Sequence, residues 1–313
     1  MSLRIAIIGA GMAGVSAGRL LADQGHEVTL LEKSRGWGGR CATKRWEGHI
    51  VDHGAQYFTL RHPEFSAAVQ QACGEALCRI TAPVLDEHGA PLPDTGRYYH
   101  REGNSRVVRS LASGLNLRTE TTVTDARALR SEYDHVISTA PLPQTAALFG
   151  QTIPAEYIPC LTVLLAYRGE PTGLCREAYA LSDHSSDLAW SACENHKAGR
   201  IGAGCTVMVA QMSEAFSRRH LESPPTDYPG LVRSMVERRW GLASENLLAA
   251  LGHRWRYARV AQSHAAPTLP ERCSFAGDAL AASRVEDAWL AGRAAARKII
   301  SSQSNHTDHI HPP

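Results

Sequence analysis

The chain has no long apolar run and no excess of charge of either sign. No apolar stretch approaches the ~20 residues that a membrane-spanning helix needs, and the run at 5–10 is too short for a signal peptide. The 33 Lys and Arg residues nearly balance the 31 Asp and Glu residues, which gives no electrostatic reason to expect a nucleic acid or an anionic membrane as partner. We therefore expect a cytoplasmic protein that binds a small molecule.

The sequence also lacks the patterns of a metal or redox-cysteine site. Its eight cysteines are scattered without a C-x-x-C pair, so neither a zinc knuckle nor a thioredoxin-type motif is present, and we expect reduced thiols. His49 and His53 are four apart but have no third ligand. We expect no metal site.

The first part of the chain predicts a βαβ unit. Ile5–Ile8 is typical of a buried parallel strand, a helix should run from about Ala13 to Gln24, and Glu27–Leu31 should form the next strand. With 43% apolar residues in 313, the chain is long enough for one large domain or two interleaved domains.

Further elements indicate a second sheet. Tyr133–Ser138 predicts another strand, whereas Thr162–Gly169 and Thr206–Ser213 are typical of a mostly antiparallel sheet. Leu231–Trp240 and Val285–Ile300 should be helices, and the chain from Ser301 onward has little to bury.

A glycine fingerprint lies between the first strand and the first helix. Gly9 allows the tight turn, Gly11 lets the backbone approach a pyrophosphate, and Gly14 lets helix and strand pack closely. The helix N-terminus then offers free N–H groups to the phosphates. Glu32 ends the second strand, at the spacing expected of a carboxylate that binds the ribose hydroxyls. These residues predict a dinucleotide site but do not separate NAD from FAD.

Two further segments resemble the flavin-containing amine oxidase superfamily. Gly38-Gly39-Arg40 is similar to its G-G-R extension, and the segment from Asp52 to Phe58 is similar to its D-x-G-A-x-x-F segment, which runs past the flavin ring. Near the other end, Gly277-Asp278 is similar to the second FAD motif, followed by a helix from about Val285 whose N-terminus would face the flavin.

This resemblance implies non-covalent FAD as the cofactor, because 277–285 contains neither Cys nor His for a covalent link. It places Arg40 near the pyrophosphate, Asp278 at the ribityl hydroxyls, and Val123, on a strand, and Ser138–Pro141 on the adenosine side. The implied cofactor-binding residues are Gly9, Gly11, Ala13, Gly14, Glu32, Lys33, Gly39, Arg40, Ala55, Gln56, Tyr57, Val123, Ala140, Gly277, Asp278, Val285 and Glu286.

Within that superfamily, the chain resembles the bacterial form of the renalase family. The similar segments are GWGGRCAT, VDHGAQYFT, AWSACENHKAGR, HRWRYARV and FAGDALAASRVEDAW. The resemblance implies an oxidase of 2- or 6-dihydro-NAD(P) isomers, which releases NAD(P)+ and reduces O2 to hydrogen peroxide. It leaves open which isomer, and whether NAD or NADP, is preferred.

Such a reaction needs no catalytic side chain, because the flavin accepts the hydride and the protein orients the ring. The expected substrate contacts are Tyr57, Phe58, Asn104, Ser105, Trp255 and Tyr257. Trp255 and Tyr257, two apart on a predicted strand, would share a face, although packing between domains is an equal alternative for them. Lys197, within the turn-like ENHKAG, is predicted to be exposed.

Two other functions remain open: a small-molecule amine oxidase, and a non-catalytic binding protein with the same fold. The expected architecture is the same for all three functions, an α/β fold. A Rossmann-like FAD-binding domain, in the hydroxybenzoate-hydroxylase-like arrangement, comprises 1–70, 100–165 and 268–303. A smaller mixed-sheet substrate domain comprises 71–99 and 166–267, and 304–313 form a flexible tail.

Overall fold

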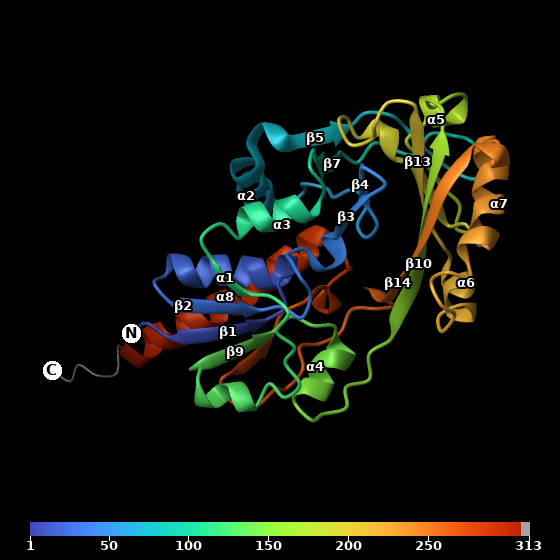
Figure 1. The fold of residues 1–313 in the computed structure, drawn as a ribbon. Coiled ribbons are helices and arrows are strands. Elements are labelled where there is room, and N and C mark those ends of the chain that lie inside the picture. Colours follow the sequence, from blue (N-terminus) through green and yellow to red (C-terminus); the bar gives the residue numbers. More distant parts are fainter. Residues whose placement is uncertain (308–313) are drawn as a thin grey trace.

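The computed structural model describes residues 1–307 and contains two main sheets (Figure 1). The first sheet is parallel, and its strands lie in the order β15 (Cys273–Phe275), β9 (His135–Ser138), β1 (Arg4–Ile8), β2 (Glu27–Leu31) and β8 (Asn116–Arg118). The predicted βαβ unit is present, with α1 at Met12–Asp23. The expected α/β fold with a Rossmann-like domain and a mixed second sheet is thus confirmed.

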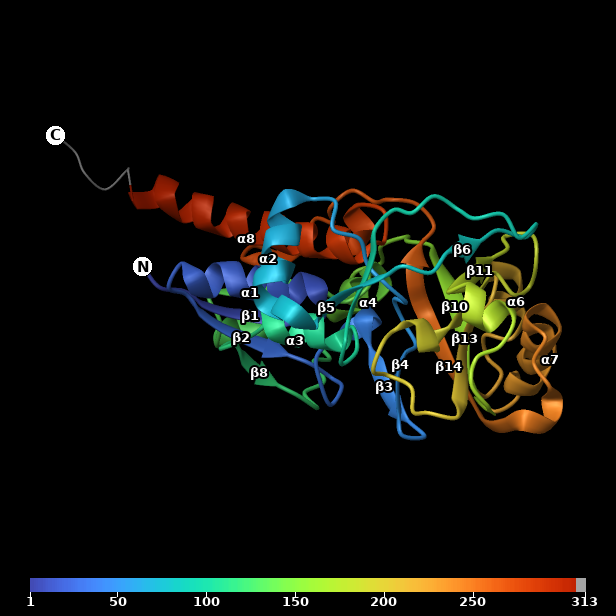
Figure 2. The same cartoon turned by 90° about the horizontal axis from the view of Figure 1, so that it is seen from above.

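Helices cover the first sheet because β1 is apolar on both sides. Ile5 and Ile7 pack toward α1 and α8, whereas Ala6 and Ile8 belong to the core on the other face. The long α8 (Val285–Thr307) runs beside α1 (Figure 2). Two further helices, α2 (Pro63–Cys73) and α3 (Ser105–Leu111), complete this layer.

The second sheet has six strands and is antiparallel except where β11 pairs with β6. Its order is β14 (Leu247–Val260), β10 (Tyr157–Arg168), β13 (Cys205–Gln211), β12 (Trp190–Cys193), β11 (Ala180–Ser182) and β6 (Val84–Leu85). Its face turned away from the first sheet is covered by α6 (Glu214–Arg219) and α7 (Pro229–Trp240) (Figure 1).

The remaining elements are short. They are two ribbons, β3 (Thr43–Trp46) with β4 (His49–Asp52) and β5 (Leu77–Ile80) with β7 (Arg97–His100); α4 (Leu142–Leu148) and α5 (Leu174–Glu177); and the 3-10 turns Gly39–Cys41, Gly74–Ala76, Ala128–Ser131, Glu194–His196, Ser244–Asn246 and Asp278–Leu280.

Two boundaries differ from the sequence-based expectation. All of β10 pairs within the second sheet, so the expected domain boundary at residue 165 falls inside a strand. The last helix continues through 304–307, which the sequence predicted as tail. The rest of the predicted tail, 308–313, lies outside the described residues. No helix within residues 1–307 is long and apolar enough to cross a membrane.

Candidate cofactor and substrate cavity

A cavity of about 1510 Å³ lies between the two sheets. It extends from the glycine turn after β1 to the face of the second sheet, where β14 and β13 contribute residues. Ordinary small-molecule sites measure about 300–1,000 Å³. The cavity therefore has room for a dinucleotide and for a second, smaller group.

The glycine turn has the geometry that a bound pyrophosphate requires. Gly9 has a φ of +103°, and a Cβ on Gly14 would lie 2.1 Å from the Gly9 carbonyl oxygen. A Cβ on Gly11 would meet only Gly39 Cα, at 3.9 Å, so this point is open to a ligand. No side chain caps the N-terminus of α1. The first N–H groups of the helix are therefore available to an anion.

Glu32, directly after β2, lines the edge of the cavity. Its carboxylate accepts the backbone N–H of Ala10 at 2.9 Å and that of Ser34 at 2.8 Å. Val123 lines the same region, but it is not on a strand as predicted. Glu120, with a φ of +52°, turns the chain after β8, so 121–124 run as coil.

The two terminal motifs meet at an ion pair. The Arg40 guanidinium donates to both carboxylate oxygens of Asp278, at 2.7 and 2.5 Å, and also to the carbonyl of Ala258 at 3.2 Å. Asp278 is buried, and both residues line the cavity. Segments 238 residues apart thus form one wall.

Segment 52–56 is held by side-chain donors. The Gln56 amide donates to the carbonyls of Asp52 and Gly54, and the Asn104 amide donates to those of Ala55 and Gln56. The Trp255 indole donates to the His53 carbonyl at 2.7 Å. Every carbonyl from 52 to 56 therefore has a partner, which fixes the part of this segment (53–55) that lines the cavity.

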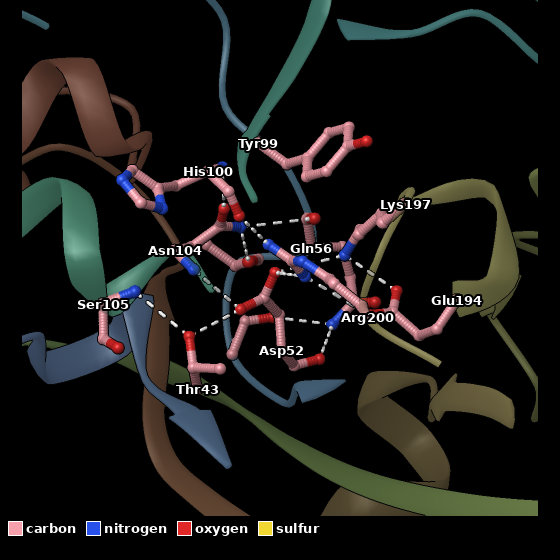
Figure 3. Close-up of polar contacts among 12 residues, drawn as sticks. Thr43, Asp52, Gln56, Tyr99, His100, Asn104, Ser105, Glu194, Lys197 and Arg200 are labelled. Carbon is pink, nitrogen blue, oxygen red and sulfur yellow. Dashed lines mark hydrogen bonds and ion pairs between the residues drawn. The ribbon is translucent and has the colours of Figure 1, made fainter. Parts of the chain in front are cut away.

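Four charged side chains lie buried behind this segment (Figure 3). Asp52, Glu194, Lys197 and Arg200 are each 0% exposed at the side chain. Lys197 Nζ lies 3.2 Å from Asp52 Oδ2 and 2.7 Å from Glu194 Oε1, and Arg200 Nη1 lies 2.5 Å from Asp52 Oδ2. We call these four residues the buried ion network. They balance two positive against two negative charges.

The network corrects the expectation that Lys197 is exposed. Its ammonium pairs with a carboxylate 145 residues earlier in the chain, a contact that the local sequence does not reveal. Burial alone would raise the pKa of Asp52, but the charges of Lys197 and Arg200, together with hydrogen bonds from the Asn104 N–H and the Thr43 hydroxyl, lower that pKa overall. Burial raises the pKa of Glu194, although the same two cations oppose it. Sequence reasoning missed Glu194 and Arg200, because they belong to a polar segment typical of a surface turn.

Two histidines of the lining, His53 and His253, lie with their ring centroids 4.5 Å apart. Burial, together with the charges of His253 and Lys44, lowers the pKa of His53 to about 3. Burial and Lys44 lower the pKa of His253 to about 4. Both line the cavity, and both imidazoles are neutral at neutral pH.

These shifts make stability depend on pH. Unfolded histidines take up a proton near pH 6.5, which folded His53 resists, so the associated stability is complete above 6.5 and falls as pH drops toward 3. At pH 5 we expect a loss of about 2 kcal/mol from His53 alone. The free energy of unfolding of His53→Asn, measured with urea at pH 7 and pH 5, should therefore decline by about 2 kcal/mol less than that of the parent protein. The exposed His88→Asn should decline as the parent does, and an unchanged decline in His53→Asn would contradict the assignment.

The structure brings most of the predicted site residues to the cavity. Those in its lining are Gly9, Gly11, Ala13, Glu32, Lys33, Gly39, Arg40, Ala55, Val123, Ala140, Trp255, Tyr257, Gly277, Asp278 and Val285. Trp255 and Tyr257 both line it, but the pairing of β14 with β10 is irregular between Cys160 and Ile158, where Tyr257 lies. A regular shared face is therefore not present there.

Other predicted residues lie behind the lining. Gly14 packs on the Gly9 carbonyl, and Glu286 accepts the backbone N–H of His62. Tyr57 packs beside Trp190, and Phe58 is buried against Phe65.

Asn104 and Gln56 reach the cavity only through the backbone that they hold, and the Ser105 N–H donates to the Thr43 hydroxyl. Tyr57, Phe58, Asn104 and Ser105 thus do not belong to the lining of the cavity, and their contact with a substrate stays a prediction. Among residues 1–307, no group of three or more His, Cys, Asp or Glu side chains could hold a metal ion.

Comparison with known proteins agrees with this geometry. Residues 7–72 match the model of the NAD(P)-binding Rossmann-like domain. A 4,4'-diapophytoene desaturase of Staphylococcus aureus (strain Newman) is 38% identical over 73 residues, 23% of this chain and 14% of that protein. An L-amino-acid oxidase of Pseudechis australis is 49% identical over 61 residues, 19% of this chain and 12% of that protein. The chain thus spans about a seventh or less of these relatives.

Solved structures match along nearly the whole chain. A protein of Exiguobacterium sp. 255-15, whose proposed activity is protoporphyrinogen oxidase, has a TM-score of 0.77 at 15% identity, covering 96% of this chain and 99% of that one. Reduced UDP-galactopyranose mutase has a TM-score of 0.73 at 12% identity, covering 96% of each chain. A putrescine oxidase variant has a TM-score of 0.69 at 12% identity, covering 96% and 99%. Residues 7–72 thus match a Rossmann-like domain, and the chain has the same fold as these solved structures.

Proposed function

We propose that this protein is an FAD-dependent oxidase of 2- or 6-dihydro-NAD(P). The observation that carries the proposal is the continuity of the cavity from the glycine turn, past Arg40 and Asp278, to the rings of Trp255 and His53. A site that binds NAD alone would need only the part of the cavity next to the glycine turn. FAD would supply a two-electron acceptor where the two sheets meet.

The chain's own residues suit non-covalent FAD. The open backbone at Gly11 and the uncapped helix fit a pyrophosphate, and the Glu32 carboxylate, directly after β2, would accept hydrogen bonds from the ribose hydroxyls. Asp278 and Arg40 present a carboxylate and a guanidinium to the middle of the cavity. Precipitation of the protein with acid should release free FAD, and flavin that stays with the pellet would contradict non-covalent binding.

The far end of the cavity suits a flat, weakly polar ring. Trp190, Trp255 and Tyr257 line it, and aromatic side chains can stack on a nicotinamide. The donor loses a hydride and becomes NAD(P)+, and O2 takes up the two electrons and the hydrogen of that hydride together with one further proton as H2O2. Because His53 and His253 are neutral, they place no strong acid or base beside the nicotinamide ring. Hydride loss needs neither. Lys197 is paired with two carboxylates and lies outside the lining.

The test is anaerobic stopped-flow absorbance of the flavin band with purified 2-, 4- and 6-dihydro-NAD(P), beside a panel of amines. We expect bleaching within seconds by the 2- or 6-isomer and recovery on admission of O2, with NAD(P)+ and H2O2 formed in equal amounts. Bleaching only by an amine would assign an amine oxidase instead. A preparation that contains no flavin would favour a binding protein.

A further inference from the structure

The cavity continues past Trp255 to Arg259 at the end of β14. Trp255 pairs across the sheet with Cys160, and Arg259 pairs with Ile158. All four residues line the cavity. Because their partners are only two residues apart on β10, Arg259 lies roughly 7 Å along the sheet from Trp255 rather than the ~13 Å of a regular four-residue step.

Arg259 differs from the other arginines of the lining. Arg40 pairs with Asp278, Arg256 with Glu222 and Arg284 with Asp287, each through two N–H groups. Among the described residues, Arg259 has no carboxylate partner.

The carboxylates near Arg259 are already engaged. Asp187 and Glu214, which line the same end of the cavity, pair with Arg219 and Arg218. Glu156, two residues before Ile158, also pairs with Arg218, at 2.8 Å. These three carboxylates are held by two arginines, and none of them pairs with Arg259. Among the described residues, Lys33, which follows β2 beside Glu32, is the other lysine or arginine of the lining that has no carboxylate partner.

We propose that Arg259 binds the phosphate next to the nicotinamide riboside of the substrate, so that the enzyme selects dihydronicotinamides that carry a phosphate. The inference rests on the proposed function. A ring stacked at Trp255 would extend its ribose along β14 and bring that phosphate to the guanidinium. Arginine suits the task because its planar N–H groups match phosphate oxygens.

The experiment compares three substrates of the isomer that reduces the flavin: the dihydro forms of NAD, of nicotinamide mononucleotide and of nicotinamide riboside. Arg259→Gln should raise KM roughly tenfold for the two phosphate-bearing forms, the effect of losing one charged hydrogen bond. Its kcat, and its KM for the riboside, should stay within twofold. Arg259→Lys should recover part of the loss because it keeps the charge.

A matched control is Arg168→Gln, at an exposed position of β10 that does not line the cavity. Its KM values should change less than twofold. An equal loss for all three substrates in Arg259→Gln would overturn the proposal, as would loss of bound FAD, which would assign Arg259 to the cofactor.

Binding of the product provides a readout without turnover. By calorimetry, NAD+ should bind Arg259→Gln roughly tenfold more weakly than the parent, and nicotinamide riboside equally well; equal binding of NAD+ to both proteins would overturn the proposal. If no dihydronicotinamide reduces the flavin, the proposed function fails. The calorimetric comparison then still decides whether Arg259 recognises a phosphate.

Discussion

Replacing Lys197 with methionine is expected to lower the free energy of unfolding by about 3–5 kcal/mol. Methionine has a similar length, so the change removes the charge and leaves the volume nearly filled. It leaves Asp52 and Glu194 with only Arg200 as a cation, in a place where no side chain is exposed to water. The excess negative charge is then uncompensated. Urea unfolding, monitored by circular dichroism, measures the difference.

The double variant Lys197→Met with Glu194→Gln separates charge from packing. It restores neutrality, since Asp52 and Arg200 remain as a pair, and it should recover a large part of the lost stability. Lys298→Met, at an exposed position of α8, is the matched control and should stay within about 0.5 kcal/mol of the parent. A single variant as stable as the parent would show that the network does not carry its charges in the folded state.

The second large effect is expected from Gly14→Ala. The new Cβ would lie 2.1 Å from the Gly9 carbonyl oxygen, a backbone atom, and 3.3 Å from Ile7 Cγ2. The start of α1 must then move away from β1, which disturbs the N–H groups that face the cavity. Overpacking of this kind costs about 1–3 kcal/mol, and we expect bound FAD per protein to fall by tenfold or more.

Gly18→Ala in the same helix is its control. The new Cβ would meet three side-chain atoms at 3.3–3.4 Å, contacts that side chains can relieve, and alanine gains up to about 1 kcal/mol of helix propensity. Flavin content should stay at the parent level. The flavin absorbance relative to protein absorbance after gel filtration measures both variants, and full flavin content in Gly14→Ala would contradict the role assigned to this close approach.

The buried ion network lies directly beside the segment that lines the cavity. Asp52 precedes the cavity-lining residues His53, Gly54 and Ala55, and its Oδ1 accepts the Asn104 backbone N–H at 2.9 Å. Asn104 in turn holds the carbonyls of Ala55 and Gln56. These residues act as positioning residues, since they set the backbone that a bound flavin would meet.

The sequence by itself determined the βαβ unit, the glycine turn and the two motifs whose residues meet in the cavity. Such features depend on local requirements. Gly9 adopts a backbone angle that favours glycine, Gly14 has no space for a Cβ, and the continuous apolar run of β1 follows from burial on both faces. These requirements can be recognised in a window of a few dozen residues.

Only the tertiary structure decided the burial of Lys197 and Arg200, the pairing of Arg40 with Asp278, and the lack of a carboxylate partner for Arg259 within residues 1–307. The physical reason is that a charged side chain is buried only where distant segments neutralise it. Asp52 comes from β4, whereas Glu194, Lys197 and Arg200 come from the connection between β12 and β13. The same polar residues would be exposed to water if those segments did not meet.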